Sequence, residues 1–342
     1  MIEAKQNKLK VIKNRLISFF KNPKEVVSFF LPIIIAAVLL IPLPYYVKLG
    51  GGIIKLDNKI QIDSNGKNGS FGALYVRESK AVVLTYLLAQ IVPSFDSEKQ
   101  EAVTINNEDE KDYNYREKLY FTSSIDAATK TAFEKAGKSV SVSSSKFLVI
   151  YIDKDSKTEL EVGDQILKIN DKKVSNYEEM LKYIEESKNR VKITVKRKNK
   201  IISTNNGFMK IDGKRKLGIV ISNEIKYTSD PKVKLKFNGR EAGPSGGLMI
   251  ALTIYDQLVT EDITKGRLVV GTGTIDANGN VGEIGGIKHK LMAASRKKAD
   301  IVFVPYDNYK EAKELYDKNK YKFDLVPVKV FDDAVNYLDK LK

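Results

Sequence analysis

Residues 243–247, GPSGG, and residues 285–288, GGIK, are two glycine-rich junctions that decide how the second half of this chain is interpreted. Each stands at the start of an apolar helical pattern, the first of them being LMIALTIYDQLV. Strand patterns and helix patterns alternate around both junctions across residues 216–342. This alternation predicts an α/β or α+β domain in which both junctions open helices.

The first junction has the features that acyl transfer requires. Small residues around Ser245 let a substrate carbonyl approach the backbone, and the N–H groups of a first helical turn can serve an oxyanion. Gly243 and Gly246 are the backbone positions expected around that oxyanion. A serine hydroxyl also needs a base within reach, and Lys288 is predicted to be that base, because desolvation and a helix N-terminus both disfavour a lysine cation.

The composition excludes several competing chemistries. Cysteine is absent and His289 is the single histidine, which rules out thiol peptidases, thiolate metal sites and multi-histidine zinc sites. We therefore expect neither a metal nor a cofactor. Of the net charge of +15, +5 lies in residues 1–25 and the rest is dispersed among acidic residues, so we expect no nucleic-acid partner.

A membrane span is predicted near the N-terminus. Residues 26–47 carry no charge over 22 positions, which as a helix is long enough to cross the hydrocarbon core. A buried core helix would be shorter and amphipathic, and a signal peptide would have a shorter apolar stretch with a cleavage site. Residues 1–25 hold seven Lys and Arg against two Glu, which predicts a cytoplasmic tail and an extracytoplasmic remainder, beginning with a connecting region over residues 48–115.

Residues 116–206 resemble a PDZ domain of the bacterial, permuted type. The resemblance is carried by a dense apolar strand at 147–152, the Val-Gly-Asp turn at 162–164, a helix at 177–184 and a strand at 191–196. It implies a β-rich domain whose exposed strand edge and neighbouring helix bind an extended peptide tail.

Three motifs resemble the proteolytic domain of the Lon family: GPSGG at 243–247, VVGTGTIDANGNVGEIGGIKHKLMAA at 269–294 and VFVPYDN at 302–308. The resemblance covers roughly residues 216–340, and we place this domain at residues 207–342. It implies that Ser245 is the nucleophile and that Lys288, which lies 43 positions later, is the general base. It also suggests that Thr272 helps to position the lysine amine.

The whole arrangement resembles the small PDZ–Lon membrane peptidases of Gram-positive bacteria. The expected fold is multidomain, with a transmembrane helix, a PDZ-like domain and a Lon-type α/β domain. No GxxxxGK[ST] motif occurs in the sequence, so we expect an ATP-independent serine endopeptidase that acts on extracytoplasmic or membrane-associated proteins. Because Lon relatives assemble into rings, a homo-oligomer is compatible with this interpretation.

Two other interpretations are open. Gly243-x-Ser245-x-Gly247 also fits the nucleophile elbow of an α/β-hydrolase, with Asp262 or Asp276 and then His289 in the required order, but only 97 residues follow Ser245. The second alternative is a membrane-tethered peptide-binding protein or holdase with an inactive peptidase domain. Taken singly, Ser245 would be an ordinary N-cap and Lys288 a surface lysine, and it is their joint occurrence in matched motifs that favours catalysis.

Overall fold

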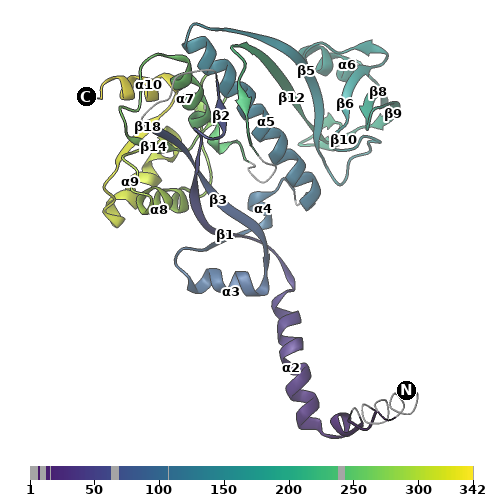
Figure 1. Ribbon diagram of the computed structural model, residues 1–342. Coiled ribbons are helices and arrows are strands. Elements are labelled where there is room, and N and C mark those ends of the chain that lie inside the picture. Colours follow the sequence, from purple (N-terminus) through teal and green to yellow (C-terminus); the bar gives the residue numbers. More distant parts are fainter. Residues whose placement is uncertain are drawn as a thin grey trace. The chain divides into compact units, whose positions relative to one another are not determined.

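The computed structural model describes residues 7, 13–15, 17–62, 69–106, 108–237 and 243–341 (Figure 1). The chain divides into two compact units. One comprises Met1–Leu49 with Glu78–Val103, and the other comprises Gly50–Arg77 with Thr104–Lys342. Strands β1 (Pro42–Lys55) and β3 (Ser70–Val82) have residues in both units.

The described part of the first unit contains several helices, one short strand and parts of two longer strands. Its elements are α2 (Pro23–Leu39), the first part of β1, the end of β3, α3 (Val83–Ile91), β4 (Asp96–Lys99) and α4 (Gln100–Val103). Asn22 caps α2 by accepting a hydrogen bond from the N–H of Lys24, and proline is well suited to the first position of a helix. Strand β1 pairs antiparallel with β4, where Lys48 and Glu98 form a salt bridge of 2.6 Å.

The apolar N-terminal stretch differs from the expected single helix over residues 26–47. Helix α2 ends at Leu39, and Pro42 begins β1, because prolines lack the N–H that would continue a helix. Among the described residues no single helix is long and apolar enough to cross a membrane. The required length and apolarity are met only by a pair of helices, Lys13–Lys21 and Pro23–Leu39, which is bent by 90°. Much of the predicted basic tail, residues 1–25, lies outside the described residues.

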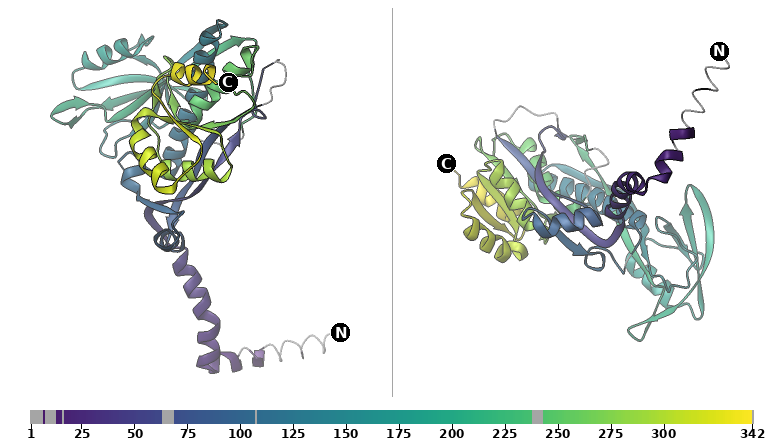
Figure 2. Two further views of the ribbon diagram at one scale, coloured as in Figure 1. Left: turned by 90° about the vertical axis from the view of Figure 1, so that its left-hand side faces the viewer. Right: turned by 90° about the horizontal axis from the view of Figure 1, so that it is seen from below.

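The second unit contains a sheet that is covered on both faces and in which β18, β17, β14 and β3 run parallel. Its strands lie in the order β18 (Asp324–Val328), β17 (Ile301–Pro305), β14 (Leu268–Gly271), β3 and β1. One face packs on α8 (Ile287–Arg296) and α9 (Tyr309–Asn319) through Val270 and Val302. The other packs through Val269 and Phe303 on α5 (Glu110–Lys135), α7 (Gly247–Leu258) and α10 (Phe331–Asp339) (Figures 1 and 2). Continuous apolar strands are typical of a sheet buried on both faces.

A second, antiparallel sheet has its own core. Its strands follow the order β12 (Ile219–Asp230), β5 (Ser139–Ile152), β6 (Gln165–Ile169), β8 (Arg190–Arg197) and β9 (Lys200–Gly207), with β7 (Lys172–Lys173) pairing β6. Helix α6 (Tyr177–Glu185) inserts Met180 among the buried strand residues. At the predicted turn, Gly163 has a φ of 94° and the buried Asp164 forms a 2.7 Å ion pair with Arg197. The strands and the helix expected at 147–196 are therefore present, and the PDZ type itself stays a prediction.

The remaining elements are short: β2 (Ile60–Gln61), β10 (Met209–Ile211), β11 (Lys214–Lys216), β13 (Lys234–Leu235), the 3-10 turn η1 (Pro244–Gly246), β15 (Thr274–Ile275), β16 (Val281–Gly282) and the 3-10 turn η2 (Tyr306–Asn308). Strand β13 pairs with β2, and β15 pairs with β16.

Segments that the sequence assigned to separate consecutive domains pair with one another in the structure. Residues 48–115 were expected only to connect, yet β3 pairs in parallel with β14 and so completes the sheet beside the predicted catalytic half. The first part of the alternating strand and helix patterns at residues 216–342 forms β12, which pairs with β5 in the second sheet instead of joining the first. The second sheet is therefore inserted into the domain that carries Ser245. Pairing between distant segments leaves no trace in local hydrophobic periodicity, which explains these differences.

Candidate active site

Ser245 lies in the turn η1, which leads directly into α7. Gly243 precedes this turn with a φ of 116°, a value that side chains other than glycine rarely adopt. Pro244 then supplies a fixed φ at the first position of the turn. Helix α7 is apolar on almost all sides and is buried, so it anchors the turn in the core.

The end of β14 holds the serine turn through its backbone. The N–H of Gly273 donates to the carbonyl of Ser245 at 2.7 Å, and the N–H of Leu248 donates to the carbonyl of Gly273 at 3.1 Å. The hydroxyl of Thr272 donates to the same Ser245 carbonyl at 3.0 Å. The residues that follow β14 therefore fix the serine turn with two hydrogen bonds to the Ser245 carbonyl and one from the Leu248 N–H.

The glycines of GPSGG have different roles. A Cβ at Gly247 would lie 2.3 Å from the Oγ of Ser124 and 2.8 Å from Cγ2 of Ile275, so this position needs glycine for space. A Cβ at Gly246 would come no closer than 3.5 Å, to Ala73, which is an ordinary contact. The predicted role of Gly243 and Gly246 around an oxyanion remains a prediction, and the structure adds that Gly246 is not required by space.

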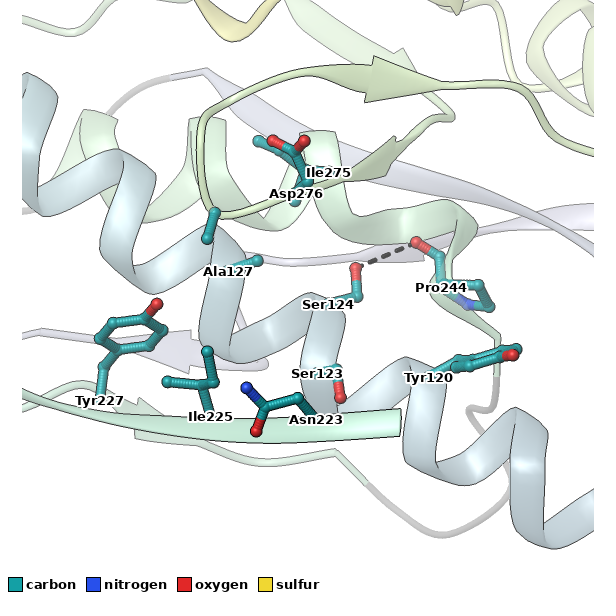
Figure 3. Close-up of a pocket in the computed structure, with 11 residues that line it drawn as sticks. Tyr120, Ser123, Ser124, Ala127, Asn223, Ile225, Tyr227, Pro244, Ile275 and Asp276 are labelled. Atoms are coloured by element: carbon teal, nitrogen blue, oxygen red, sulfur yellow. Dashed lines mark hydrogen bonds between the residues drawn. The ribbon is translucent and has the colours of Figure 1, made fainter. Parts of the chain in front are cut away.

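Helix α5 supports the turn from the other side. The hydroxyl of Ser124 donates to the carbonyl of Pro244 at 3.1 Å (Figure 3). A pocket of about 270 Å³ lies beside this bond, between α5, β12 and the loop after Thr274, as Figure 3 shows. Its walls include Tyr120 and Tyr227. This contact on the serine turn was not found from the sequence, because α5 lies 120 residues upstream.

The lysine that the fold brings to this turn is Lys290. Its side chain is buried, with the residue 3% exposed, and its Nζ donates to the Oγ of Thr272 at 3.0 Å. A hydroxyl has one proton to donate and lone pairs to accept, so Thr272 can receive the lysine bond while it donates to Ser245. The geometry places one hydroxyl group between the lysine amine and the serine backbone. The expectation that Thr272 positions a lysine amine agrees with these contacts.

Lys288, the predicted base, lies two residues earlier on α8 and is only partly buried. Successive helical residues turn by about 100°, so side chains two positions apart point to nearly opposite sides. The contact with Thr272 therefore makes Lys290 a second candidate for the base, and Lys288 stays the prediction made from the sequence. A signal for Lys290 was present, because Ile287, Lys290, Leu291 and Ala294 follow the i, i+3, i+4, i+7 spacing of a buried helix face.

The carboxylates of the α/β-hydrolase interpretation have structural roles instead. Asp276 accepts hydrogen bonds from the backbone of Asn278 and from Asn280, and Asp262 accepts them from Thr264, Gly69 and Gly266. These bonds lower the pKa of both carboxyls, although partial burial opposes them. Each aspartate thus closes a loop. Within the part of the chain that the structure describes, no group of three His, Asp or Glu side chains is arranged to hold a metal ion.

A serine on a glycine-bracketed turn and a buried lysine linked to it by a threonine hydroxyl define a site of the serine hydrolase type with a lysine base. Comparison with known proteins agrees with this class. Residues 239–339 match the model of the Lon protease (S16) C-terminal proteolytic domain.

Individual relatives align over 27–28% of the chain. The Lon protease of Aster yellows witches'-broom phytoplasma (strain AYWB) is 34% identical over 92 residues, which is 27% of this chain and 11% of the relative. The Lon proteases of Rickettsia bellii (strain RML369-C) and Azospirillum brasilense are 37% and 36% identical over 95 residues, which is 28% of this chain and 12% of each relative. The aligned part thus spans only about a ninth of these proteins.

Proposed function

We propose that this chain is a serine endopeptidase in which Ser245 is the nucleophile and Lys290 is the general base. The observation that carries the proposal is the hydrogen bond between the buried Lys290 amine and Thr272, whose hydroxyl also bonds the Ser245 carbonyl. The match of residues 239–339 to a Lon proteolytic domain supports the same chemistry.

The proposed reaction proceeds through an ester of the serine. Burial and the positive end of α8 both disfavour a charged Lys290, so its neutral amine accepts the proton of the Ser245 hydroxyl as the oxygen attacks a peptide carbonyl. The resulting ammonium donates that proton to the leaving amine, and the acyl-enzyme forms. Lys290 then takes a proton from water as the water oxygen attacks the ester, and it returns this proton to the Ser245 oxygen as the bond to the acyl group breaks. Thr272 keeps the amine oriented throughout.

Anchoring in a membrane is part of the proposal. The uncharged residues 26–47 and the basic tail before them support it. Helix α2 buries none of its side chains, and Phe29, Ile34 and other large apolar residues on it are exposed to solvent. Exposed apolar side chains all around a helix are favourable in lipid and costly in water. The positive-inside rule then assigns the peptidase to the extracytoplasmic side.

The inserted antiparallel sheet is proposed to bind substrate tails as a PDZ-like domain does. Support comes from the order of its strands and from α6 beside them. Since the sequence contains no GxxxxGK[ST] motif, the proposed substrates are unfolded or loosely folded proteins that need no ATP-driven unfolding.

The test compares two lysines two residues apart. We expect the full-length chain in detergent to cleave fluorescein-labelled casein, and Ser245→Ala to lose at least about a thousand-fold in rate. Lys290→Ala should lose at least about a hundred-fold, and Lys288→Ala no more than about threefold. Circular dichroism and a thermal melt show whether each variant is folded, and Lys290→Met preserves much of the buried volume if Lys290→Ala is unstable.

Two results would contradict the proposal. Unchanged cleavage by folded Ser245→Ala would remove the nucleophile. A large loss in Lys288→Ala with full activity in Lys290→Met would return the base to the lysine that the sequence favoured.

A further inference from the structure

A partly open apolar pocket lies directly beside Ser245. Its volume is about 40 Å³, and Ser245 itself forms part of the wall. Gly243 and Gly246 of the serine turn and Ile250 of α7 also line it. The rest of the wall comes from the region of β1 and β3 and from the aromatic rings of Phe121 and Phe237. Most of this wall lies outside residues 239–339, the part that matches the Lon domain.

The lining selects for apolar groups. No charged side chain is among the described residues that form the wall, and the hydroxyls of Ser245 and Tyr75 are its only polar side-chain groups. Burying a charged side chain there would cost hydration without a compensating partner, whereas an aliphatic group would gain by leaving water.

The size of the pocket limits what can enter. A site for one water molecule needs roughly 10–15 Å³ on this measure, so 40 Å³ holds about three or four heavy atoms. This matches the branched end of a leucine or valine side chain. A phenyl ring, with six ring carbons, exceeds it.

Phe121 closes the pocket from α5. Its ring meets that of Phe237 edge-on, with 5.3 Å between the ring centres. Three residues further along the same helix, Ser124 bonds the carbonyl of Pro244, the residue before the serine. Residues three apart lie on the same face of a helix, so one face of α5 fixes both the serine turn and the wall of the pocket beside it.

We propose that Phe121 is a specificity-determining residue, and that the pocket it closes accepts the side chain of the substrate residue whose carbonyl Ser245 attacks. The preferred residue at that position is leucine or valine, and larger aromatic and charged residues are rejected. This inference rests on the proposed peptidase function and names its substrate class.

The experiment uses internally quenched peptides that are identical except for Leu, Val, Phe or Asp before the scissile bond. For the wild-type chain we expect kcat/KM to be at least about tenfold higher for Leu than for Phe, and higher still relative to Asp. Phe121→Ala enlarges the pocket and should raise the Phe-to-Leu ratio of kcat/KM by at least about tenfold. Tyr120→Ala is the matched control, because this neighbouring aromatic residue on α5 lines the pocket of about 270 Å³ beside Ser124 and not the pocket beside Ser245. The Phe-to-Leu ratio of this variant should stay at the wild-type value.

The outcomes separate this inference from the function on which it rests. Ser245-dependent cleavage with the same Phe-to-Leu ratio in wild type and Phe121→Ala overturns the pocket and leaves the peptidase standing. An equal change in ratio for Tyr120→Ala also overturns it, since α5 would then act only through its general stability. If Phe121→Ala does not fold, Phe121→Leu must show an intermediate increase in the ratio. Folded wild-type chain that cleaves neither these peptides nor casein contradicts the peptidase function itself.

Discussion

The Nζ of Lys290 donates to the Oγ of Thr272 at 3.0 Å, in a place where the two residues are 3% and 0% exposed. Two buried polar side chains that bond each other satisfy groups that would otherwise be costly to remove from water. The bond also connects the lysine amine to the serine turn, because the Thr272 hydroxyl donates to the Ser245 carbonyl. Thr272 therefore links the lysine side chain to the backbone of the serine turn.

Thr272→Val should lower kcat for peptide hydrolysis by about ten- to a hundredfold with little change in KM. Valine retains the shape of threonine but cannot accept from Lys290 or donate to Ser245, so the amine loses its orientation while substrate binding is untouched. Thr272→Ser keeps the hydroxyl and is the control, with kcat expected within about threefold of wild type. Steady-state kinetics on one peptide measures both. An increase in KM at constant kcat would contradict a positioning role.

Adjacent glycines of the serine turn should respond differently to alanine. In Gly247→Ala the new Cβ would meet Ser124 and Ile275 at distances that real Cβ atoms do not show, and we expect a loss of about 1–3 kcal/mol in the free energy of unfolding. Gly246→Ala makes only ordinary contacts and should change stability by less than about 0.5 kcal/mol. Chemical denaturation of the two variants side by side is the measurement. Equal losses would show that the turn is not packed as described.

The sequence predicted the serine junction and Thr272 because their signals are local. A glycine-bracketed serine before an apolar helix and a threonine after a strand can be read within a few residues. The sequence favoured Lys288 because that choice depended on the first turn of a helix, whereas Ile287, Lys290 and Leu291 share the buried face of the same helix. Which side of a helix faces the serine is decided by tertiary packing.

The contribution of upstream residues could not be predicted for a different reason. Strand β3 and helix α5 are separated in sequence from β14 and α7 by the whole antiparallel sheet. The pairing of Ser70–Ala73 with Leu268–Gly271, and the bond from Ser124 to Pro244, are contacts between distant segments. Local periodicity reports that a segment is a strand or a helix, but not which partner it meets.

Ser124→Ala should lower stability by about 0.5–1.5 kcal/mol and reduce kcat, because the Pro244 carbonyl loses a hydrogen bond next to the nucleophile. Ser123→Ala provides a close control on the same helix and the same pocket. The Oγ of Ser123 is buried, and among the described residues it meets no hydrogen-bond partner, so its removal should be neutral or slightly stabilising. Thermal melts and measurements of kcat for the two variants test this difference. Equal behaviour of the two serines would contradict a specific role for Ser124.

Asp126, two residues after Ser124, predicts a dependence of stability on pH. Burial raises the pKa of its carboxyl to about 6, against the opposing effects of the Tyr227 backbone N–H and of Lys226, while Glu224 adds to the increase. A carboxyl whose pKa is higher in the folded state than in the unfolded chain binds more protons when folded. Its stabilising contribution is therefore complete below the ordinary value of 3.8 and is lost as the pH rises through about 6.

Asp126→Asn removes this titration while it keeps an oxygen that can accept from the Tyr227 N–H. Relative to wild type, the variant should gain stability as the pH rises from 4 to 7, by on the order of 1 kcal/mol, because the carboxyl is only half-buried and solvent screens part of the effect. Urea unfolding of both proteins at pH 4.5, 5.5 and 7.0 measures the difference. Above pH 7 the two curves should run parallel, since the carboxyl is then ionised in both states. If Asp126→Asn instead loses stability relative to wild type as the pH rises, the charged carboxylate stabilises the contact between α5 and β12.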